Sequence, residues 1–309
     1  MPPALLVLVG PTAVGKTGLA LRLARELDAE VVSADSVQIY RGLDIGSAKP
    51  SPAERAQVRH HLIDVAEPEE SFSAARYAAL ADQAIAEITA RNRRVLVAGG
   101  TGLYIKALLH GLAPAPAVDP ALRARLREEW DRQGPQALHQ RLAQADPATA
   151  RRLHPHDRQR ILRALEVCLQ SSRPFSESQA AHGFRPARYP HLYLGLERPR
   201  PELNRRIEER SRQMWAGGLL EEVQGLLAGG LGPSAPGLKS LGYCQALAVL
   251  QKQMTPAQAL EDMIKKTKAY SKRQLTWFRG LKGLHWHSPQ DVQGVLARAG
   301  EFLAGIEVG

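Results

Sequence analysis

Cysteine is scarce in this sequence of 309 residues, where only Cys168 and Cys244 occur, far apart and inside apolar stretches of helical pattern. So sparse a set argues against a disulfide framework or a CxxC metal site, and predicts core thiols in a reducing compartment. Long hydrophobic runs are missing too, since none reaches the roughly 18 residues that a membrane helix needs. The N-terminal segment MPPALLVLVG also lacks the basic region and cleavage site of a signal peptide. We therefore expect a cytoplasmic protein without a membrane partner.

Acidic side chains are outnumbered, because 31 Asp and Glu against 41 Lys and Arg give a formal net charge of +10. A positive field attracts polyanions and speeds their encounter. Nucleic acid is therefore the partner that the charge favours, but a chain that is merely basic fits the composition as well. The position of the charges has to decide between these two interpretations.

The spacing of apolar residues predicts an α/β fold. Residues 4–9 read ALLVLV, a run typical of a strand buried on both faces of a parallel sheet. Helical patterns, such as the one at residues 73–92, separate several other strand candidates. These further strands are expected at residues 31–34, 62–65, 95–98 and 192–196.

The pattern changes near Asp119, which precedes a proline and a run of leucines at helical spacing, and Asp146 repeats the same start signal. Helices there interrupt the α/β alternation, which resumes near residue 191. We predict a P-loop NTPase-like core with a parallel sheet flanked by helices, made of residues 1–116 and 188–309. Residues 117–187 are expected to form an all-helical insertion domain.

The sequence GPTAVGKT follows the first strand candidate and precedes a helix, and it matches the phosphate-binding P-loop in full. Its glycines let successive backbone amides point inward, and the helix N-terminus adds a partial positive charge. Lys16 is expected to reach the distal phosphate, and the Thr17 hydroxyl to hold Mg²⁺. The predicted phosphate-binding residues are Gly10, Pro11, Thr12, Ala13, Val14, Gly15, Lys16 and Thr17.

A P-loop does not reveal which reaction occurs. Nucleotide hydrolases and kinases usually have a second strand that ends in an acidic residue, but the candidate RVLVAGG ends in glycines. The strand VVSAD does end in Asp35. Asp35 is thus a candidate for a metal-associated carboxylate, for a general base beside the phosphate, or for a residue that caps a turn.

Several further segments accompany the P-loop in a fixed order. They read SADSVQIYRGLDIGSAKP (33–50), HHLIDV (60–65), AGGTGLY (98–104), DRQRILRALEV (157–167) and AYSKRQLTWFR (269–279). With GPTAVGKT, this set resembles the tRNA dimethylallyltransferase family over nearly the whole chain. DSVQIYRGLDIG and KRQLTWFR are the segments most specific to it.

The resemblance implies transfer of a dimethylallyl group from dimethylallyl diphosphate to the exocyclic N6 amine of the adenosine immediately 3′ of the tRNA anticodon. Diphosphate is the leaving group, which explains a P-loop without the second acidic strand end. The resemblance implies that Asp35 is the general base, that Mg²⁺ is the cofactor, and that the anticodon stem-loop is the RNA partner. It places Thr101 near the reacting adenine, although Thr101 fits a helix N-cap equally well.

Charge in the C-terminal region is one-signed. Lys265, Lys268, Lys272 and Arg279 fall on one face of a helix that has no acidic residue after Asp262. Such a face suits RNA phosphates, whereas a solvated face usually mixes both signs. In the same helix Trp277 and Phe278 are either base-stacking residues or, more in keeping with their type, apolar anchors.

Further site residues come from the resemblance. Arg206, Arg210 and Arg273 are candidates for a second diphosphate clamp, with ion pairs to Glu202, Glu208 or Glu209 as the alternative for the first two. Gln245 stands where the family leads us to expect an acidic residue. The residues expected to bind tRNA are Asp35, Ser36, Val37, Gln38, Thr101, Arg123, Gln159, Arg160, Ile161, Leu162, Arg163, Lys268 and Lys272.

Two other functions remain open at the level of sequence. A small-molecule P-loop kinase would consume ATP, and a non-catalytic RNA-binding P-loop protein would bind RNA without modifying it. We expect a monomer.

Overall fold

The structure is a computed structural model that describes residues 2–113, 116–117, 119–171, 173–183 and 186–307. The chain forms two compact units: a core unit, Met1–Leu109 with Ala187–Gly309, and a helical unit, His110–Pro186. The helical unit therefore begins a few residues before the expected position 117 and ends beside the expected position 187. Within the described residues, no helix is both long and apolar enough to cross a membrane.

Six parallel strands form the sheet of the core unit: β1 (Leu5–Val9), β2 (Ala29–Ala34), β3 (His60–His61), β4 (Arg94–Gly99), β5 (His191–Leu196) and β6 (Leu284–His287). Their order across the sheet is β3-β2-β4-β1-β5-β6. All of β1 is buried because both faces of the sheet are covered, which explains its uninterrupted apolar run. The predicted α/β class is confirmed.

Two strands differ from the expectation. Residues 62–65 are not a strand, so that prediction is wrong: Leu62 and Asp64 have φ angles of 62° and 58°, in the left-handed region that a strand excludes. The strand lies just before them, at β3. The edge strand β6 was not predicted, because LHWH is short and alternates without an apolar run.

Helices connect the strands and continue beyond them. Those of the core unit are α1 (Lys16–Glu26), α2 (Pro52–Gln57), α3 (Ala74–Ala90), α4 (Gly102–His110), α9 (Arg200–Met214), α10 (Leu220–Ala228), α11 (Tyr243–Leu250), α12 (Pro256–Arg279) and α13 (Val292–Glu307). A π-helical turn, Trp215–Leu219, joins α9 to α10. The long helix α12 begins with a capping box of Thr255 and Gln258.

The helices form one layer on each face of the sheet. On one face α3 and α4 pack on the strands together with Phe278 of α12, and Tyr77 and Ile88 of α3 are fully buried there. On the other face the apolar sides of α1, α9 and α13 form the second layer, with Leu23 and Ile207 at its centre. Doubly covered sheets of this kind place their ligands at the carboxyl ends of the strands.

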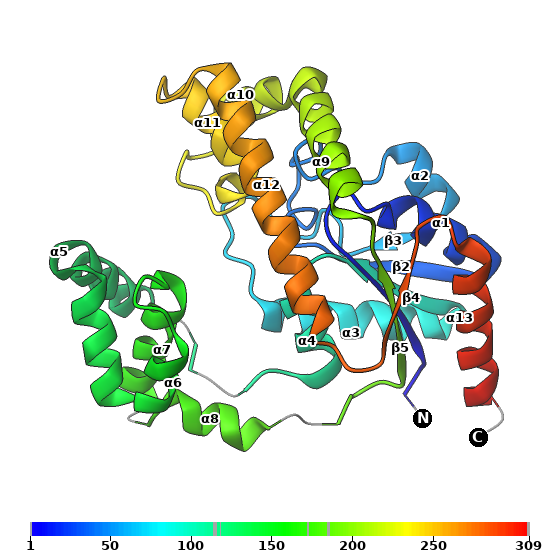
Figure 1. Cartoon of the computed structure of the whole chain (residues 1–309), viewed down its shortest axis with the longest axis horizontal. Coiled ribbons are helices and arrows are strands. Elements are labelled where there is room, and N and C mark those ends of the chain that lie inside the picture. The colour runs from blue at the N-terminus through cyan, green and yellow to red at the C-terminus, as the bar shows by residue number, and fades with distance from the viewer. Residues whose placement is uncertain (1, 114–115, 118, 172, 184–185, 308–309) are drawn as a thin grey trace. The chain divides into compact units, whose positions relative to one another are not determined.

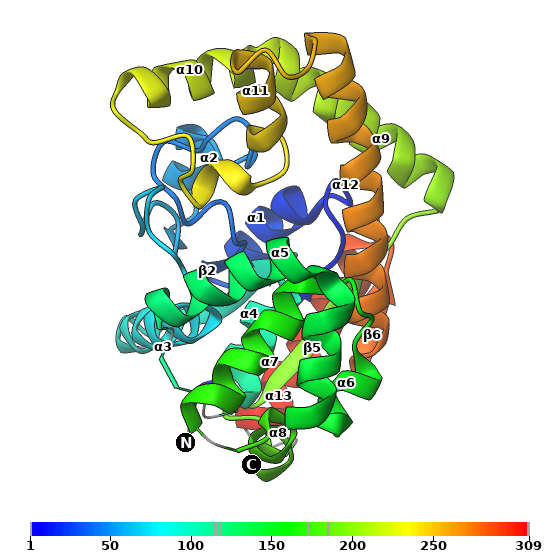
Figure 2. The same cartoon turned by 90° about the vertical axis from the view of Figure 1, so that its left-hand side faces the viewer.

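A third apolar cluster lies beyond the sheet. It joins Ile39 and Leu43, from the loop after β2, to Val223 of α10, Tyr243 of α11 and Met263 of α12. Helices α9 and α12 lie side by side, as both views show (Figures 1 and 2). This cluster fixes the loop after β2 against the helices that follow β5.

The helical unit contains α5 (Pro120–Ala145), α6 (Pro147–Arg152), α7 (Arg158–Ser171) and α8 (Phe175–His182). The predicted caps are confirmed: Asp119 accepts hydrogen bonds from the amides of Ala121 and Leu122, and Asp146 accepts one from the amide of Thr149. Helix α5 is interrupted by Gly134 at φ 83°, before Pro135. The core of the helical unit consists of leucines of α5 packed on Ile161, Leu162 and Leu165 of α7.

Candidate active site

The P-loop curls between β1 and α1. Gly10, at φ 155°, lies so close to β5 that a Cβ would stand 2.8 Å from the carbonyl oxygen of Leu196. Gly15, at φ 113°, precedes the first residue of α1 in the left-handed region. These two glycines therefore bring the loop over the sheet edge and turn its end into the helix N-terminus.

Lys16 folds back over the loop. Its Nζ donates to the carbonyl oxygens of Gly10 at 2.9 Å and Pro11 at 2.8 Å. Burial lowers the pKa of Lys16 to about 7; Asp35 opposes this shift and Arg210 adds to it. Lys16, Asp35 and Arg210 therefore lie within electrostatic range of one another.

Arginines of the segment after β5 support the loop from outside. Arg198 Nε donates to the carbonyl oxygen of Val14 at 2.8 Å, and Arg206 Nε donates to that of Ala13 at 2.9 Å. Arg206 thus holds the P-loop backbone, whereas Arg210, one turn later, lines the cavity described below. The described contacts do not include the alternative, ion pairs of Arg206 or Arg210 with nearby glutamates. Those glutamates have other partners: Glu202 pairs with Arg198, Glu209 with Arg205, and Glu208 with Arg212 and Lys268.

Asp35 lies directly after β2. Its Oδ1 accepts hydrogen bonds from the amides of Val37 at 2.8 Å and Gln38 at 3.3 Å, so it caps the turn that it begins. Among the described residues, no hydrogen bond engages its Oδ2. Capping and a chemical role are therefore compatible, because they use different oxygens.

Thr101 follows β4 and faces the same turn. Its hydroxyl accepts a hydrogen bond from the amide of Ser36 at 3.1 Å, while its backbone carbonyl receives the first amides of α4, Tyr104 and Ile105. Only glycine fits two residues before Thr101, since a Cβ on Gly99 would lie 2.1 Å from the carbonyl oxygen of Ala34. The Thr101 hydroxyl thus joins the ends of β2 and β4.

The side chain of Gln38 is fully engaged inside the loop. Its Oε1 accepts from the Ser33 hydroxyl at 3.0 Å, and its Nε2 donates to the carbonyl oxygens of Ser47 at 3.4 Å and Ala48 at 3.2 Å. Its expected contact with tRNA would therefore cost internal hydrogen bonds. The side chain of Gln38 thus shapes the loop after β2.

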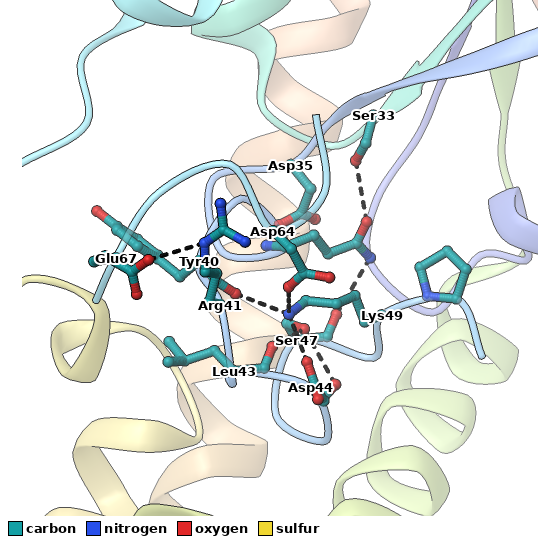
Figure 3. A network of polar contacts seen from close by, with 12 residues as sticks. Ser33, Asp35, Tyr40, Arg41, Leu43, Asp44, Ser47, Lys49, Asp64 and Glu67 are labelled. Carbon is teal, nitrogen blue, oxygen red and sulfur yellow. Dashed lines mark hydrogen bonds and ion pairs between the residues drawn. The ribbon is translucent and has the colours of Figure 1, made fainter. Parts of the chain in front are cut away.

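Lys49 lies at the centre of that loop, with 2% of its side chain exposed. Its ammonium donates to the Tyr40 carbonyl at 2.8 Å, to Asp44 Oδ1 at 2.5 Å and to Asp64 Oδ1 at 2.6 Å, as Figure 3 shows. Arg55 also binds Asp64, and the Lys49 and Arg55 hydrogen bonds outweigh burial to hold the pKa of Asp64 below its usual value. The loop is thus closed by a buried charge cluster rather than by regular structure.

A cavity of about 680 Å³ opens inside the core unit, within the ~300–1,000 Å³ range of small-molecule sites. The P-loop, the turn at Asp35, and facing sides of α9 and α12 form its walls. The side chains that carry most of its chemistry are Lys16, Thr17, Asp35, Arg210, Tyr270, Arg273 and Gln274.

The sequence indicated neither Tyr270 nor Gln274. Burial, then the charge of Asp35, raises the pKa of Tyr270, while a hydrogen bond with Thr101 opposes the rise. Gln274 donates to the carbonyl oxygen of Gly100 and accepts from the amide of Thr12, each at 2.9 Å. Only the helical spacing Tyr270, Arg273, Gln274 could have suggested that both line one site with the predicted Arg273.

The basic face of α12 is less one-signed than the sequence suggested. Lys268 lies 3.3 Å from Glu208 of α9, and Arg279 lies 4.0 Å from Glu197. Lys265 and Lys272 are exposed. Phe278 is fully buried and anchors the helix, whereas Trp277 is 39% exposed.

In the helical unit, the expected tRNA-binding residues divide into exposed and buried ones. Ile161 and Leu162 belong to its core, so their side chains are not available to RNA. Arg123 binds the fully buried Glu166 with two nitrogens, and Arg163 binds the same carboxylate at 3.0 Å. Gln159 and Arg160 are exposed.

Gln245 has a structural explanation. Its Nε2 donates to Asp262 Oδ2 at 2.8 Å, and its Oε1 accepts from the amide of Gly242 at 2.8 Å. A carboxylate at this buried position would face the carboxylate of Asp262. The glutamine therefore suits the acidic neighbour that this chain has.

The chain is similar to known proteins over nearly its whole length. Residues 38–281 match the family described as IPP transferase. The chain belongs to this family. The tRNA dimethylallyltransferase of Anaeromyxobacter sp. (strain Fw109-5) is 50% identical over 95% of this chain and 97% of its own. The tRNA dimethylallyltransferase 1 of Trichlorobacter lovleyi is 46% identical over 98% of this chain and 100% of its own.

Solved structures give the same result. The full-length tRNA isopentenylpyrophosphate transferase from Bacillus halodurans is 34% identical, with a TM-score of 0.73 and 99% of both chains covered. A eukaryotic dimethylallyltransferase acting on tRNA shares the fold, with a TM-score of 0.82 at 23% identity over 98% of this chain and 80% of its own. The IPP transferase fold thus extends over the whole core and helical units.

Proposed function

We propose that this protein transfers a dimethylallyl group from dimethylallyl diphosphate to the exocyclic N6 amine of the adenosine immediately 3′ of the tRNA anticodon, releasing diphosphate. One observation carries the proposal: a single cavity brings the P-loop and Arg210 to face the carboxylate of Asp35. An anion site thus lies beside a group able to accept a proton, as an alkyl transfer with a diphosphate leaving group requires.

The phosphate side of the cavity stabilises the leaving group. Charge develops on diphosphate as the allylic carbon–oxygen bond breaks, and Lys16, Arg210 and residues of the P-loop line the cavity in which that charge would form. Arg210 is buried, which lowers the pKa of its guanidinium, while Asp35 counteracts that shift. Arg273, on α12, lines the same cavity and is available to the diphosphate.

Thr17 fits a role in holding Mg²⁺. It stands in the first turn of α1 with its side chain exposed, next to Lys16, and it lines the cavity. A bound Mg²⁺ would neutralise part of the diphosphate charge. The protein would contribute the Thr17 hydroxyl, with the remaining ligands coming from the substrate and water.

The other side of the cavity receives the adenine. An exocyclic amine is weakly basic and loses a proton as it forms its bond to carbon, and Asp35 Oδ2 is the group positioned to accept that proton. The anticodon loop is single-stranded, so extracting one of its bases costs little. Two exposed cations would bind the phosphates of this loop: Arg160 in the helical unit and Lys272 on α12. Such an enzyme would act on tRNA in the cytoplasm, as a monomer.

The sharpest test uses Asp35→Asn. Asparagine Oδ1 still accepts from the amides of Val37 and Gln38, so the turn is kept and only the proton acceptor is lost. We expect the wild-type protein, with Mg²⁺, dimethylallyl diphosphate and unmodified tRNA, to yield prenylated adenosine on nucleoside digestion. We expect Asp35→Asn to lower the single-turnover rate by ~100-fold or more with tRNA affinity preserved.

Two results would contradict the proposal. Absence of prenylated adenosine from a tRNA with consecutive adenosines after the anticodon would exclude the activity. Consumption of ATP with phosphorylation of a small molecule, unaffected by dimethylallyl diphosphate, would identify a kinase instead.

A further inference from the structure

One face of α12 lines the cavity along about half of the helix. Met263, Thr267, Tyr270 and Gln274 contribute to the wall, at the spacings of four, three and four residues that place side chains on one side of a helix. At ~1.5 Å per residue, this face extends over roughly 16 Å. Gln274 lies at the end that meets the P-loop, and its residue is 6% exposed.

Gln274 bridges two loops that are remote from it in sequence. Its Oε1 accepts a hydrogen bond from the backbone amide of Thr12 in the P-loop, at 2.9 Å, and its Nε2 donates to the carbonyl oxygen of Gly100, also at 2.9 Å. The orientation of the side-chain amide is fixed by these partners, because an amide N–H only donates and a carbonyl only accepts. Turning the amide over would lose both bonds.

The backbone after β4 lies very close to the side chain of Gln274. A Cβ on Gly100 would stand 2.3 Å from Gln274 Nε2, so the backbone after β4 approaches the glutamine as closely as a glycine allows. The residue after Gly100 is Thr101, whose hydroxyl holds the amide of Ser36 beside Asp35. A chain of hydrogen bonds therefore runs from the P-loop through Gln274 to the turn that carries Asp35.

We propose that Gln274 is a positioning residue that fixes the spacing between the P-loop and the Asp35 turn, and so aligns the prenyl carbon with the adenine amine. This inference rests on the proposed function, since that reaction needs the diphosphate and the amine on opposite sides of one carbon. Rates of such reactions fall steeply when reacting groups shift by ~1 Å. Because the Thr12 amide is already engaged, it is also withheld from the diphosphate.

Two isosteric variants separate the contributions of its two bonds. Gln274→Met keeps the length of the side chain and removes both bonds. Gln274→Glu keeps an acceptor for the Thr12 amide but, when ionised, cannot donate to Gly100. A protonated glutamic acid regains that donor, so the Glu variant should recover as the pH falls. The matched controls are Gln258→Met and Gln258→Glu, at an exposed glutamine near the start of the same helix.

The measurement is the single-turnover rate of prenyl transfer from about pH 5.5 to pH 8.5, each variant divided by wild type, beside tRNA affinity and thermal unfolding. The division removes the titration that both proteins share; Tyr270 of α12, Lys16 of the P-loop and Asp35 are the titratable groups that line the cavity with Gln274. We expect a ~10–100-fold loss for Gln274→Met with tRNA Kd changed less than ~2-fold. We expect the Gln274→Glu ratio to rise as pH falls, and the Gln258 ratios to stay flat.

The outcomes are separable. If wild type forms no prenylated adenosine, the proposed function fails. If wild type is active and Gln274→Met equals it, or if the Gln274→Glu ratio is flat with pH, the positioning role is excluded. Should Gln274→Met not fold, the Gln274→Glu profile decides, because that variant keeps one bond.

Discussion

The ammonium of Lys49 lies 2.6 Å from the carboxylate of Asp64, in a loop where 2% of the Lys49 side chain is exposed. Asp64 also donates its backbone amide to the carbonyl oxygen of Gln38, and Gln38 in turn holds Ser33. The charge cluster thus reaches the turn at Asp35 through a single intermediate residue. Its integrity should matter to catalysis as well as to stability.

We therefore predict that Lys49→Met lowers the free energy of unfolding by ~3 kcal/mol, because it leaves carboxylates near Lys49 without their shared cation. The turnover number should fall more than tRNA affinity does, since the loop lines the cavity. Denaturant unfolding and steady-state kinetics would measure both effects. Asp44→Asn is the matched control: the Asp44 side chain is 59% exposed, so we expect at most ~1 kcal/mol there. Equal effects of the two substitutions would show that burial of Lys49 is unimportant.

The fold was predictable where burial leaves a simple pattern. β1, which is covered on both faces, has the uninterrupted apolar sequence LLVLV. The Asp-Pro pairs at the starts of α5 and α6 correctly predicted the N-caps of these helices. The strand prediction at residues 62–65 was wrong because the apolar residues there belong to a turn. Leu62 packs in the core from a left-handed backbone conformation, which the periodicity of a sequence does not reveal. Edge strand β6 is half-buried throughout, and its two core-packed residues, Leu284 and Trp286, are too few for a pattern in the sequence to reveal the strand.

The site was predictable where chemistry sits at a strand end. Asp35 follows β2 directly and Lys16 ends the P-loop that follows β1, and parallel strands bring those ends together. Gln274 was not predictable, because a glutamine in a basic helix resembles a surface residue and its partner Thr12 is 262 positions away. Arg123 was expected to contact RNA because of the family resemblance, and no pattern in the sequence reveals its partner Glu166, 43 positions away.

Substitutions in the cavity should affect turnover, whereas substitutions on the exposed basic face of α12 should affect tRNA binding. Lys16→Ala and Thr17→Ala should abolish turnover and leave tRNA affinity within ~2-fold, since neither is placed on the exposed basic face. Lys272→Ala should weaken tRNA binding and reduce the slope of log Kd against log salt by ~1. Lys268→Ala should have a smaller effect, because Lys268 already pairs with Glu208. Binding titrations at several salt concentrations would test this, and loss of tRNA affinity in Lys16→Ala would contradict it.

Lys16 should couple diphosphate binding to proton uptake. Burial lowers its pKa to about 7 in the free protein, and a bound diphosphate favours the charged ammonium and so raises that pKa. Below about pH 7 Lys16 is charged before and after binding, so few protons are taken up. At about pH 8 the free lysine is mostly neutral and must gain a proton, so affinity should fall as pH rises, by up to ~10-fold per pH unit.

Calorimetry of dimethylallyl diphosphate binding in buffers of different ionisation enthalpy measures this uptake. Lys16→Met provides the correction for protonation of the ligand itself. We expect close to one extra proton for wild type at about pH 8 and little at about pH 6. The same uptake in Lys16→Met would assign the proton to another group.

In the helical unit, Arg123 and Arg160 should behave in opposite ways. Arg123 spans the helices by binding Glu166, whose side chain is fully buried, whereas the Arg160 side chain is 69% exposed and only approaches Asp157, at 3.5 Å. Removing Arg123 leaves Arg163 as the remaining cation on a buried carboxylate. We predict that Arg123→Met destabilises the protein by ~2–3 kcal/mol, somewhat less than loss of the sole partner of a buried charge.

The double variant Arg123→Met/Glu166→Gln should recover part of that loss, because the buried charge is then gone together with its partner. Arg160→Ala should leave unfolding unchanged and weaken tRNA binding, if the exposed side of α7 meets phosphates. Thermal unfolding of each variant, beside tRNA titrations under conditions where all remain folded, separates the two roles. A folded Arg123→Met with native stability and reduced tRNA affinity would instead support the RNA contact that the family resemblance implies for Arg123.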